Sequence, residues 1–464
     1  MLNRFSTAAA ALAFIVACSS NHSTDDTSDP TGPAPDTGDQ ADPGADPGAG
    51  SAGDPGTNPG TGSAGDPGSE PDPGTPPVAA CPIGTASWAT LIGPAWILPD
   101  PDADIAVDAS GNVLLAARAE RPGDASGLTK LSPKGEVIFS KPFGTVVATD
   151  AAGNAYVAGI FTAPIDLGLG ELQPFAKNDV FVAKLDAAGN VVLARALHLC
   201  GCGEGDLQSI AVDATTGRIA VSGTLIGTAV LEANGDLAFM VAPAGNAAFN
   251  SRGELIIAGS FTAALDFGDG PIDPSDQGFV NKEGFVAAVD ATGKFLWHQH
   301  FDGGDVRVTG VAIDAADDIA VVGYTTGHVV LFGEDFHVIS APESGRVTGA
   351  FAVELDATGS LIWKRGQASG VEANGVAVNA SGAVIAAGAT TGNAGFDRIP
   401  LLSDPAPAAP PMTSVILTTS AFPASGYARY VDLAFDACGS LYGSIIVSET
   451  ASAGSPINLY VQKM

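Results

Sequence analysis

The side chains best suited to binding a metal lie together in one loop-forming stretch of the sequence. Four aspartates, Asp266, Asp269, Asp273 and Asp276, are separated mainly by glycine, proline and serine. Calcium takes about six to eight oxygen ligands, and a loop that contains glycine can bring carboxylates together around the ion. These four residues are the calcium candidate, although ordinary solvation of a polar loop explains the same pattern and is the favoured interpretation.

Two histidines suggest a second, different metal site. His298 and His300 flank Gln299, and alternate residues of a strand point to the same face of a sheet. Two imidazoles on one face could share a transition metal, but no third ligand stands beside them in the sequence. A solvated strand is therefore the favoured interpretation.

Catalytic motifs are missing from the sequence. It contains no HExxH, P-loop or GxSxG motif and no pair of zinc-binding CxxC motifs. Asp100, Asp102 and Asp104 alternate ahead of the first repeat, but no glycine follows where an EF-hand loop requires one. The sequence thus predicts no catalytic residue and no cofactor other than the calcium candidate, so we expect a protein that is not an enzyme.

The chain is strongly acidic, with a formal net charge of −31 over 464 residues. A nucleic-acid-binding protein needs a basic surface to meet phosphate, so this class is disfavoured. Residues 19–80 hold 11 acidic residues and no Lys or Arg. They consist largely of Asp, Pro, Gly, Ser and Thr and carry almost no large apolar side chain. Such a segment cannot offset the entropy lost on ordering, so we expect residues 18–80 to be a disordered acidic linker.

Residues 1–17 have the pattern of a secretion signal. Arg4 precedes an apolar run over 5–17 that is too short to span a membrane as a helix. The run ends in Ile15-Val16-Ala17-Cys18, which resembles the lipobox of bacterial lipoprotein signals. The resemblance implies that Cys18 becomes the N-terminus and carries lipid, palmitate included, which would anchor the protein to a membrane. Ser19 after the cysteine implies sorting to the outer membrane, with exposure at the cell surface as a further possibility; a secreted protein with a chance cysteine is the alternative.

From residue 81 to 464 the chain repeats one pattern seven times. Each unit opens with an Asx residue that is followed, usually three residues later, by glycine. An Asx side chain bonds the following backbone N–H groups and glycine adopts a positive φ, which is the chemistry of a hairpin turn. The apolar runs on either side of the turn predict short strands. These first turns begin at Asp108, Asp150, Asp213, Asn250, Asp314, Asn379 and Asp436.

A second turn in most units predicts two further strands. Four residues after the glycine of that turn stands a large apolar side chain, a spacing that indicates a fixed register and packing on the next sheet. The second turns begin at Ser132, Asp186, Glu232, Asp290 and Asp356, and the large side chains are Phe139, Leu193, Phe239, Trp297 and Trp363. The sixth unit is degenerate here, because a Pro-rich insertion over 403–412 precedes no clear second turn.

The seventh unit reaches the end of the sequence after its third strand. Gly84 and Trp88 have the same spacing as the glycine and tryptophan of other units. We therefore expect the strand around Trp88 to pair beside the strand around Val461. The predicted fold is all-β, a seven-bladed β-propeller of four-stranded antiparallel blades whose last blade is closed by the N-terminal strand. Closure removes free sheet edges.

Four cysteines remain besides Cys18, in an oxidising compartment. Cys81 and Cys438 fall on neighbouring turns of the closing blade, so we expect a disulfide that staples the ring. Cys200 and Cys202 are separated by one glycine and are predicted to pair with each other. Reactive or metal-binding thiols are the alternative for this second pair.

The units resemble bacterial β-propeller repeats of the SBBP type, and the resemblance covers essentially all of 81–464. It implies a propeller fold, carries over no catalytic residue, and indicates a surface lipoprotein of unknown ligand. The segments that carry it are 150–159, 165–168, 179–190, 210–213 and 265–268.

Three functions fit this sequence. The first is a surface lipoprotein, expected to be a monomer, whose propeller binds a protein or a glycan through loops of unequal length. The second is a propeller enzyme, a lyase or hydrolase, with its site at the mouth of the central channel. The innermost strands, such as Ile105-Ala106-Val107, have plain apolar sequences and count against it. The third is a purely structural envelope component.

Overall fold

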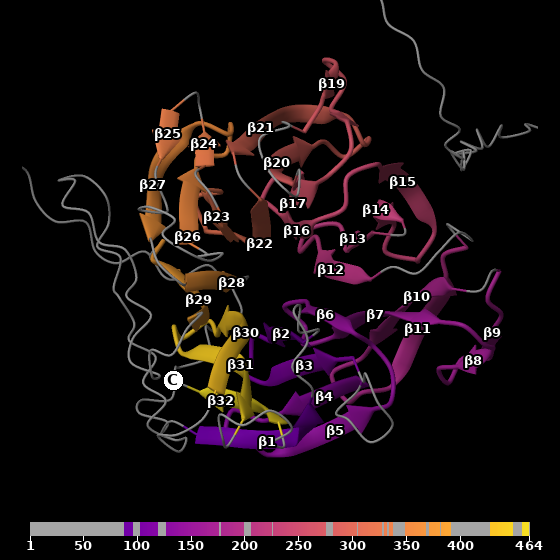
Figure 1. The fold of residues 1–464 in the computed structure, drawn as a ribbon. Coiled ribbons are helices and arrows are strands. Elements are labelled where there is room, and N and C mark those ends of the chain that lie inside the picture. Colours follow the sequence, from indigo (N-terminus) through magenta and orange to yellow (C-terminus); the bar gives the residue numbers. More distant parts are fainter. Residues whose placement is uncertain are drawn as a thin grey trace, which may run out of the picture. The chain divides into compact units, whose positions relative to one another are not determined.

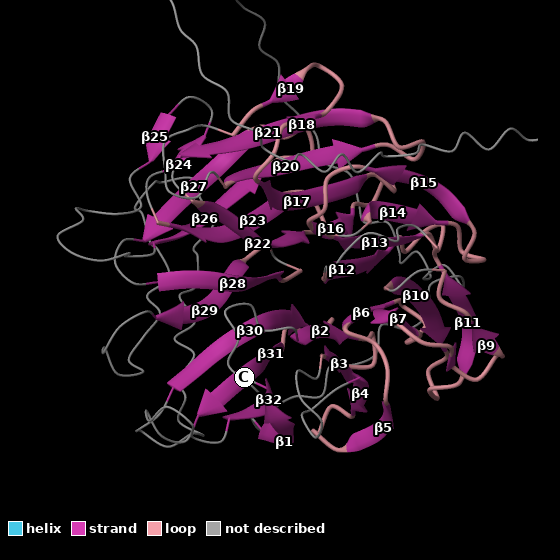
Figure 2. Cartoon of the chain, turned by 45° about the vertical axis from the view of Figure 1, so that its right-hand side comes forward, coloured by secondary structure: helices cyan, strands magenta, loops and turns pink. Residues whose placement is uncertain are grey.

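The structure of the chain is a computed structural model, and all of its described strands lie within the unit Ala79–Met464. The domain boundaries expected at residues 17 and 80 lie outside the described residues. Within the described part of the chain there are 32 strands and no helix (Figure 2). The described residues are 88–95, 103–118, 127–175, 178–198, 206–224, 226–274, 282–303, 305–326, 329–331, 334–336, 349–367, 371–380, 382–390, 427–448 and 457–463.

Asx turns of the predicted kind join the strands. In the turn that begins at Asp150, the carboxylate Oδ1 accepts the backbone N–H groups of Ala152 and Asn154, both at 3.0 Å. Gly153 closes this turn with a φ of 77°. Asp186 bonds Ala188 and Asn190 in the same way. The turn chemistry deduced from the sequence is confirmed at these positions.

Three sheets contain strands of the first half of the domain, and each antiparallel sheet follows chain order from the inner strand outward. Sheet 1 consists of β2 (Ala103–Val107), β3 (Val113–Ala117), β4 (Gly127–Leu131) and β5 (Val137–Lys141). Sheet 2 consists of β6 (Val146–Thr149), β7 (Ala155–Phe161), β10 (Asp179–Leu185) and β11 (Val191–Ala196). Sheet 3 consists of β12 (Leu207–Val212), β13 (Ile219–Gly223), β14 (Gly227–Leu231) and β15 (Leu237–Val241).

The remaining sheets follow the same order with two variations. Sheet 4 consists of β16 (Asn246–Phe249), β17 (Leu255–Phe261), β20 (Glu283–Val289) and β21 (Phe295–Gly303). Sheet 5 consists of β22 (Val306–Ile313), β23 (Ile319–Thr325), β26 (Gly349–Leu355) and β27 (Leu361–Gln367). Sheet 6 has two strands, β28 (Val371–Val378) and β29 (Val384–Thr390). Sheet 7 consists of β30 (Tyr427–Phe435), β31 (Leu441–Ser448), β32 (Ile457–Lys463) and β1 (Trp88–Ala95).

Short hairpins are inserted between the second and third strands of three sheets. They are β8 (Ile165–Asp166) with β9 (Glu171–Leu172), β18 (Leu265–Asp266) with β19 (Pro271–Ile272), and β24 (Val329–Leu331) with β25 (Glu334–Phe336). β24 also pairs with the end of β21 and extends sheet 4 to six strands. Because the sheets are antiparallel, these insertions lie at the opposite end of each sheet from the Asx turns. We name the two ends the loop rim and the turn rim.

The sheets form a propeller ring (Figure 1). The inner strands contact one another in the succession β2, β6, β12, β16, β22, β28, β30 and back to β2. β1 pairs antiparallel with β32, and Thr90 lies opposite Val461. The predicted closure of the last sheet by the N-terminal strand is confirmed.

The predicted number of complete blades is wrong for the described residues. Six sheets reach at least four strands, whereas sheet 6 has only two. The sixth unit was the one whose second turn is missing from the sequence, and residues 391–426, with the Pro-rich insertion, lie outside the described residues. The structure therefore shows an all-β propeller with six complete blades rather than seven.

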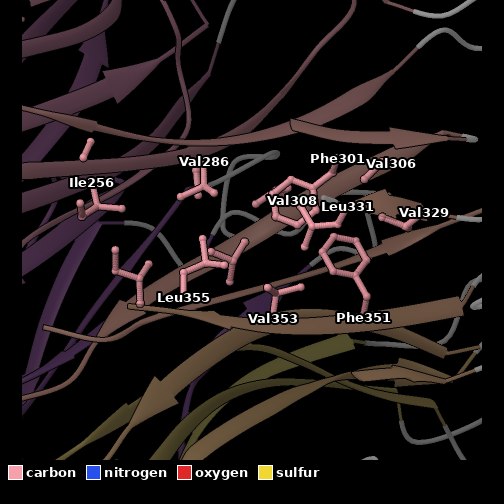
Figure 3. Packing of buried hydrophobic residues seen from close by; sticks show 14 residues of the cluster. Ile256, Val286, Phe301, Val306, Val308, Val329, Leu331, Phe351, Val353 and Leu355 are labelled. Carbon is pink, nitrogen blue, oxygen red and sulfur yellow. The ribbon is translucent and has the colours of Figure 1, made fainter. Parts of the chain in front are cut away.

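Apolar side chains fill the seams between neighbouring sheets. Seven buried clusters occur in the described residues, and each lies between two successive sheets. The largest joins sheets 4 and 5, where Val286 and Phe301 meet Val308, Phe351 and Val353 (Figure 3). Burial of this apolar surface is the main favourable term that holds the sheets together.

Except for Trp363, which has no described second turn ahead of it, the large side chain after a second turn packs on the turn glycine of the next sheet, as the spacing predicted. A Cβ on Gly359 would lie 2.6 Å from the Trp297 ring, and one on Gly135 would lie 2.7 Å from the Trp88 ring. The Trp297 indole N–H donates to the Ala357 carbonyl at 3.2 Å. Phe139 and Phe239 approach the next turn glycine in the same manner. Only glycine leaves room for this contact.

Replacing a glycine that packs on the next sheet should destabilise the protein more than replacing a turn glycine that makes no such contact. Gly359 and Gly439 have φ values of 82° and 78°, but nothing lies within 4 Å of a Cβ on Gly439. We expect Gly439→Ala to lose about 1 kcal/mol from backbone strain. Gly359→Ala should lose about 3 kcal/mol, because it also overpacks the seam against Trp297. Urea unfolding of the two variants checks this difference, and equal losses would contradict the seam contact.

Candidate functional site

Polar side chains at one repeat position bind neighbouring sheets together around the axis of the ring. The position is four residues before the first Asx of each unit. In three units its side-chain oxygen accepts the backbone N–H of the inner strand of the next sheet. The bonds are Asp432 Oδ2 with Ile105 at 3.2 Å, Asp104 Oδ2 with Val147 at 2.8 Å, and Ser209 Oγ with Ala247 at 2.9 Å.

Two of these residues form a carboxyl pair where the ring closes. Asp104 lies on β2 of sheet 1 and Asp432 on β30 of sheet 7, and their carboxyl groups share a hydrogen bond. Both groups are half-buried by surface area but lie deep in the domain. Desolvation and then the charge of Asp432 raise the pKa of Asp104 well above its usual value. Desolvation raises the pKa of Asp432 to about 6.

The hydrogen bonds of this pair define what it can do. Asp432 Oδ1 also accepts the N–H of Leu433 at 2.8 Å, so both of its oxygens are engaged. Two adjacent carboxyl groups without a neighbouring cation favour retention of a proton between them. The pair is therefore suited to joining sheet 1 to sheet 7.

Sequence reasoning missed this pair although the signal was present. Asp104 was considered only as part of an alternating acidic run, and the inner strands were judged from the apolar residues that follow. Aligning all units on their first Asx places Asp104, Ser209 and Asp432 in one column. Gly310 and Gly375 occupy that column in sheets 5 and 6, where a Cβ would come within 3 Å of the next inner strand.

Two buried acids pair with partly exposed histidines at the loop rim of sheets 2 and 4. Asp179 and Glu283 each begin a third strand and are almost fully buried. His198 Nδ1 lies 2.7 Å from Asp179 Oδ2, and His300 Nε2 bonds to Glu283. Asp179 Oδ2 also accepts the N–H of Phe175 at 2.9 Å, which orders the end of the inserted segment. Each pair therefore has the contacts of a structural interaction that fixes the start of a third strand.

The structure does not bring the calcium candidates together. Asp266 Oδ1 accepts the N–H groups of Gly268 and Gly270 at 2.7 and 3.1 Å, which makes it a turn residue. Asp269 lies 3.0 Å from His298 Nε2. Asp273 is exposed, and Asp276 lies outside the described residues. Within the described part of the chain, no group of three metal-binding side chains is present, so calcium binding stays a prediction.

The two histidines of the second proposed metal site are engaged separately. His298 stacks on the Phe267 ring at 4.5 Å and bonds to Asp269, whereas His300 bonds to Glu283. Each imidazole thus has its own acidic partner. The interpretation of this stretch as a solvated strand did not include these two contacts.

The cysteine predictions are tested only at one residue. Cys438 lies in the turn between β30 and β31 and is disulfide-bonded. Cys18, Cys81, Cys200 and Cys202 lie outside the described residues. The Cys81–Cys438 and Cys200–Cys202 pairings and the lipidation of Cys18 therefore stay predictions.

No protein-family model and no curated protein matches the chain. Similar solved structures include a protein of unknown function from Bacteroides caccae, with TM-score 0.34, 11% identity, and coverage of 61% of this chain and 94% of that one. The WD40 β-propeller domain of Doa1 has TM-score 0.37, 11% identity, and coverage of 81% and 97%. The Dos1 propeller has TM-score 0.40, 11% identity, and coverage of 80% and 94%. These distant likenesses do not bear on function.

A search of the described segments for a helix able to cross a membrane finds none.

The Asp104–Asp432 pair predicts a stability that falls as pH rises. Because the folded-state pKa values are raised, the pair stabilises at low pH and this contribution is lost as pH passes through about 6. Asp432→Asn should therefore gain about 2 kcal/mol relative to wild type between pH 5 and pH 8. Thermal unfolding at both pH values measures it. The control is Asp290→Asn, since the pKa of Asp290 is lowered and the group stays ionised throughout. If Asp432→Asn changes the unfolding temperature relative to wild type by the same amount at both pH values, the two carboxyl groups do not share a proton.

Proposed function

We propose that the protein is a non-enzymatic binding module of the cell envelope that holds a protein partner at its loop rim. The observation that carries this proposal is the contrast between the two rims. The turn rim is made of repeated turns whose polar atoms bond within the domain. The loop rim carries unlike insertions, and the one in sheet 2 exposes two large apolar side chains.

Polar groups of the turn rim bond within their own turns, and some of them also bond to the next sheet. Arg218 donates to the Ala291 carbonyl of the next sheet at 2.8 Å while pairing with Glu232. Ser251 donates through both its N–H and its hydroxyl to Asp317 of the next sheet, each at 2.8 Å. A surface engaged in this way is well suited to stabilising the ring.

The loop rim offers a different surface on sheet 2. Phe175 and Leu169 are 77% and 55% exposed, and both lie in the segment that contains β8 and β9. The equivalent hairpin of sheet 4 has Asp269 in the place of Leu169. Exposed aromatic and aliphatic side chains on an inserted loop are typical of a protein-binding site. A glycan that stacks on Phe175 is the alternative outcome.

The lipid anchor and the complete ring also belong to this proposal. The lipobox resemblance around Cys18 and the acidic linker support a tethered outer-membrane lipoprotein, and the repeat motifs support an SBBP-type propeller. We infer that sheet 6 is the inner half of a seventh blade. β28 contacts β22 and β30, and sheet 6 contributes to the buried clusters on both of its sides.

Substitution of the exposed loop-rim residues should abolish partner capture. We expect Phe175→Ser and Leu169→Ser to lose at least tenfold in recovery of a saturable partner from envelope extracts, since aromatic anchors often contribute more than 1 kcal/mol each. Leu296→Ser removes an apolar side chain of 47% exposure from β21, away from this rim, and is the matched control. If only Leu296→Ser loses partner capture, the binding site does not lie at the loop rim of sheet 2.

Replacement of the lipobox cysteine should release the protein from the membrane. We expect Cys18→Ser to prevent incorporation of a labelled palmitate analogue and to move the protein out of the membrane fraction, because one hydroxyl cannot take the place of the lipidated thiol. Cys202→Ser serves as the control for general thiol labelling. Label retained by the Cys18 variant would refute the anchor and leave the binding rim untouched.

A further inference from the structure

Three sheets place a lysine at the same position on the turn rim. Lys130, Lys184 and Lys463 lie on third strands, each opposite the residue six positions after the first Asx of its unit. Lys130 Nζ is 2.9 Å from Asp108 Oδ2 and donates to the Gly153 carbonyl of sheet 2 at 3.1 Å. It thus neutralises a turn carboxylate and bonds across a seam.

The same position reinforces the turn in the other two sheets. Lys184 Nζ is 3.6 Å from Asp150 Oδ2. Lys463 lies 5.2 Å over the ring of Tyr442, whose hydroxyl donates to Asp436 at 3.2 Å. A cation at this position therefore accompanies the turn aspartate in sheets 1, 2 and 7.

Sheet 5 reverses the charge at this position. Glu354 lies opposite Ala320, six residues after Asp314, and is 4% exposed. Its carboxyl group interacts with the negative charges of Asp318 and Asp314, and the Trp363 side chain shares a hydrogen bond with it. Sheet 5 thus has an acid where three other sheets have a base.

Within the described part of the chain, the charged groups around Glu354 have other partners. Asp317 is 3.2 Å from Arg252, and Arg252 also pairs with Glu254. Asp356 bonds to its own turn through Thr358. Arg365 stacks over Trp363 at 5.6 Å. None of these cations is among the groups that shift the pKa of Glu354.

Glu354 lies beside the seam between sheets 5 and 6. A Cβ on Gly382, in the β28–β29 turn, would be 3.1 Å from Asp314 Oδ2, much as one on Gly153 would be 3.3 Å from Asp108 Oδ2. Of the nine buried residues that form the cluster in this seam, five are alanines. Small side chains bury little apolar surface, so the described part of this seam has less hydrophobic stabilisation than the Phe- and Leu-containing seam of sheets 4 and 5.

We propose that Glu354 is a pH-sensitive lock on the contact between sheets 5 and 6: protonated, it packs as a neutral group, and ionised, it adds a third negative charge and loosens the contact. Desolvation and the carboxylates of Asp318 and Asp314 raise the pKa of Glu354 to about 7. The stabilisation is therefore present at low pH and is lost as pH rises through about 7. This inference is independent of the lipid anchor and of the binding partner.

Hydrogen exchange of the full-length protein at pH 6 and pH 8 tests the lock, after correction for intrinsic exchange. We expect wild-type protection of β28 and β29 amides to fall about tenfold from pH 6 to pH 8, whereas β3 amides of sheet 1 serve as the internal reference. Glu354→Gln should remove this pH dependence because the amide does not ionise. Glu354→Lys should keep β28 protected at both pH values, since the ammonium can reach Asp314 as Lys130 reaches Asp108.

Asp432→Asn separates this effect from that of the carboxyl pair at the closing seam. It should leave the tenfold change in β28 unaltered if Glu354 is responsible. A Glu354→Gln protein that keeps the wild-type pH dependence, or an Asp432→Asn protein that loses it, would overturn the proposal. If Glu354→Gln does not fold, Glu354→Lys tests the proposal instead. Wild-type pH dependence of β28 protection in that variant would also overturn the proposal.

Discussion

The structure depends on the contact between the outer strand of one sheet and the second turn of the next. A large side chain lies against a glycine that has no Cβ, and the indole of Trp88 or Trp297 also donates to a turn carbonyl of the next sheet. A four-stranded sheet alone cannot bury both faces, so each sheet is stable only between two neighbours. Pairing of β1 with β32 completes the succession by joining the two ends of the domain in one sheet.

Polar bonds reinforce the apolar seams where the sheets approach most closely. Asp317 is a departure from the repeat at which the contact between two sheets is kept. It stands where most units have glycine and adopts a φ of 68°, a conformation that is unfavourable by about 1 kcal/mol for a residue with a Cβ. Its carboxylate accepts hydrogen bonds from Ser251 and Arg252 of sheet 4. These bonds across the seam offset the strain.

Local sequence predicted those features of the fold that one turn or one spacing determines. The Asx turns, the packing of Trp297 on Gly359 and the closure at Trp88 all follow from short-range patterns. The Asp104–Asp432 pair was not predicted, because its members are more than three hundred residues apart and only the closed ring brings them together. Closeness in sequence did not predict the contacts of two of the calcium candidates: Asp266 and Asp269 are neighbours in sequence, but each bonds a different partner.

Departures from the repeat are therefore more informative about function than the repeat itself. Positions that keep the pattern, such as Lys130 with Asp108, have their charges paired inside the domain and little capacity left for a ligand. Departures take two physical forms. One insertion at the loop rim exposes the apolar side chains of Leu169 and Phe175, and on this surface the proposed binding function rests. Substitutions within the frame, such as Glu354 in a lysine position, place a buried acid near the carboxylates of Asp314 and Asp318. The strength of one seam then depends on protonation, while the rest of the ring keeps its contacts.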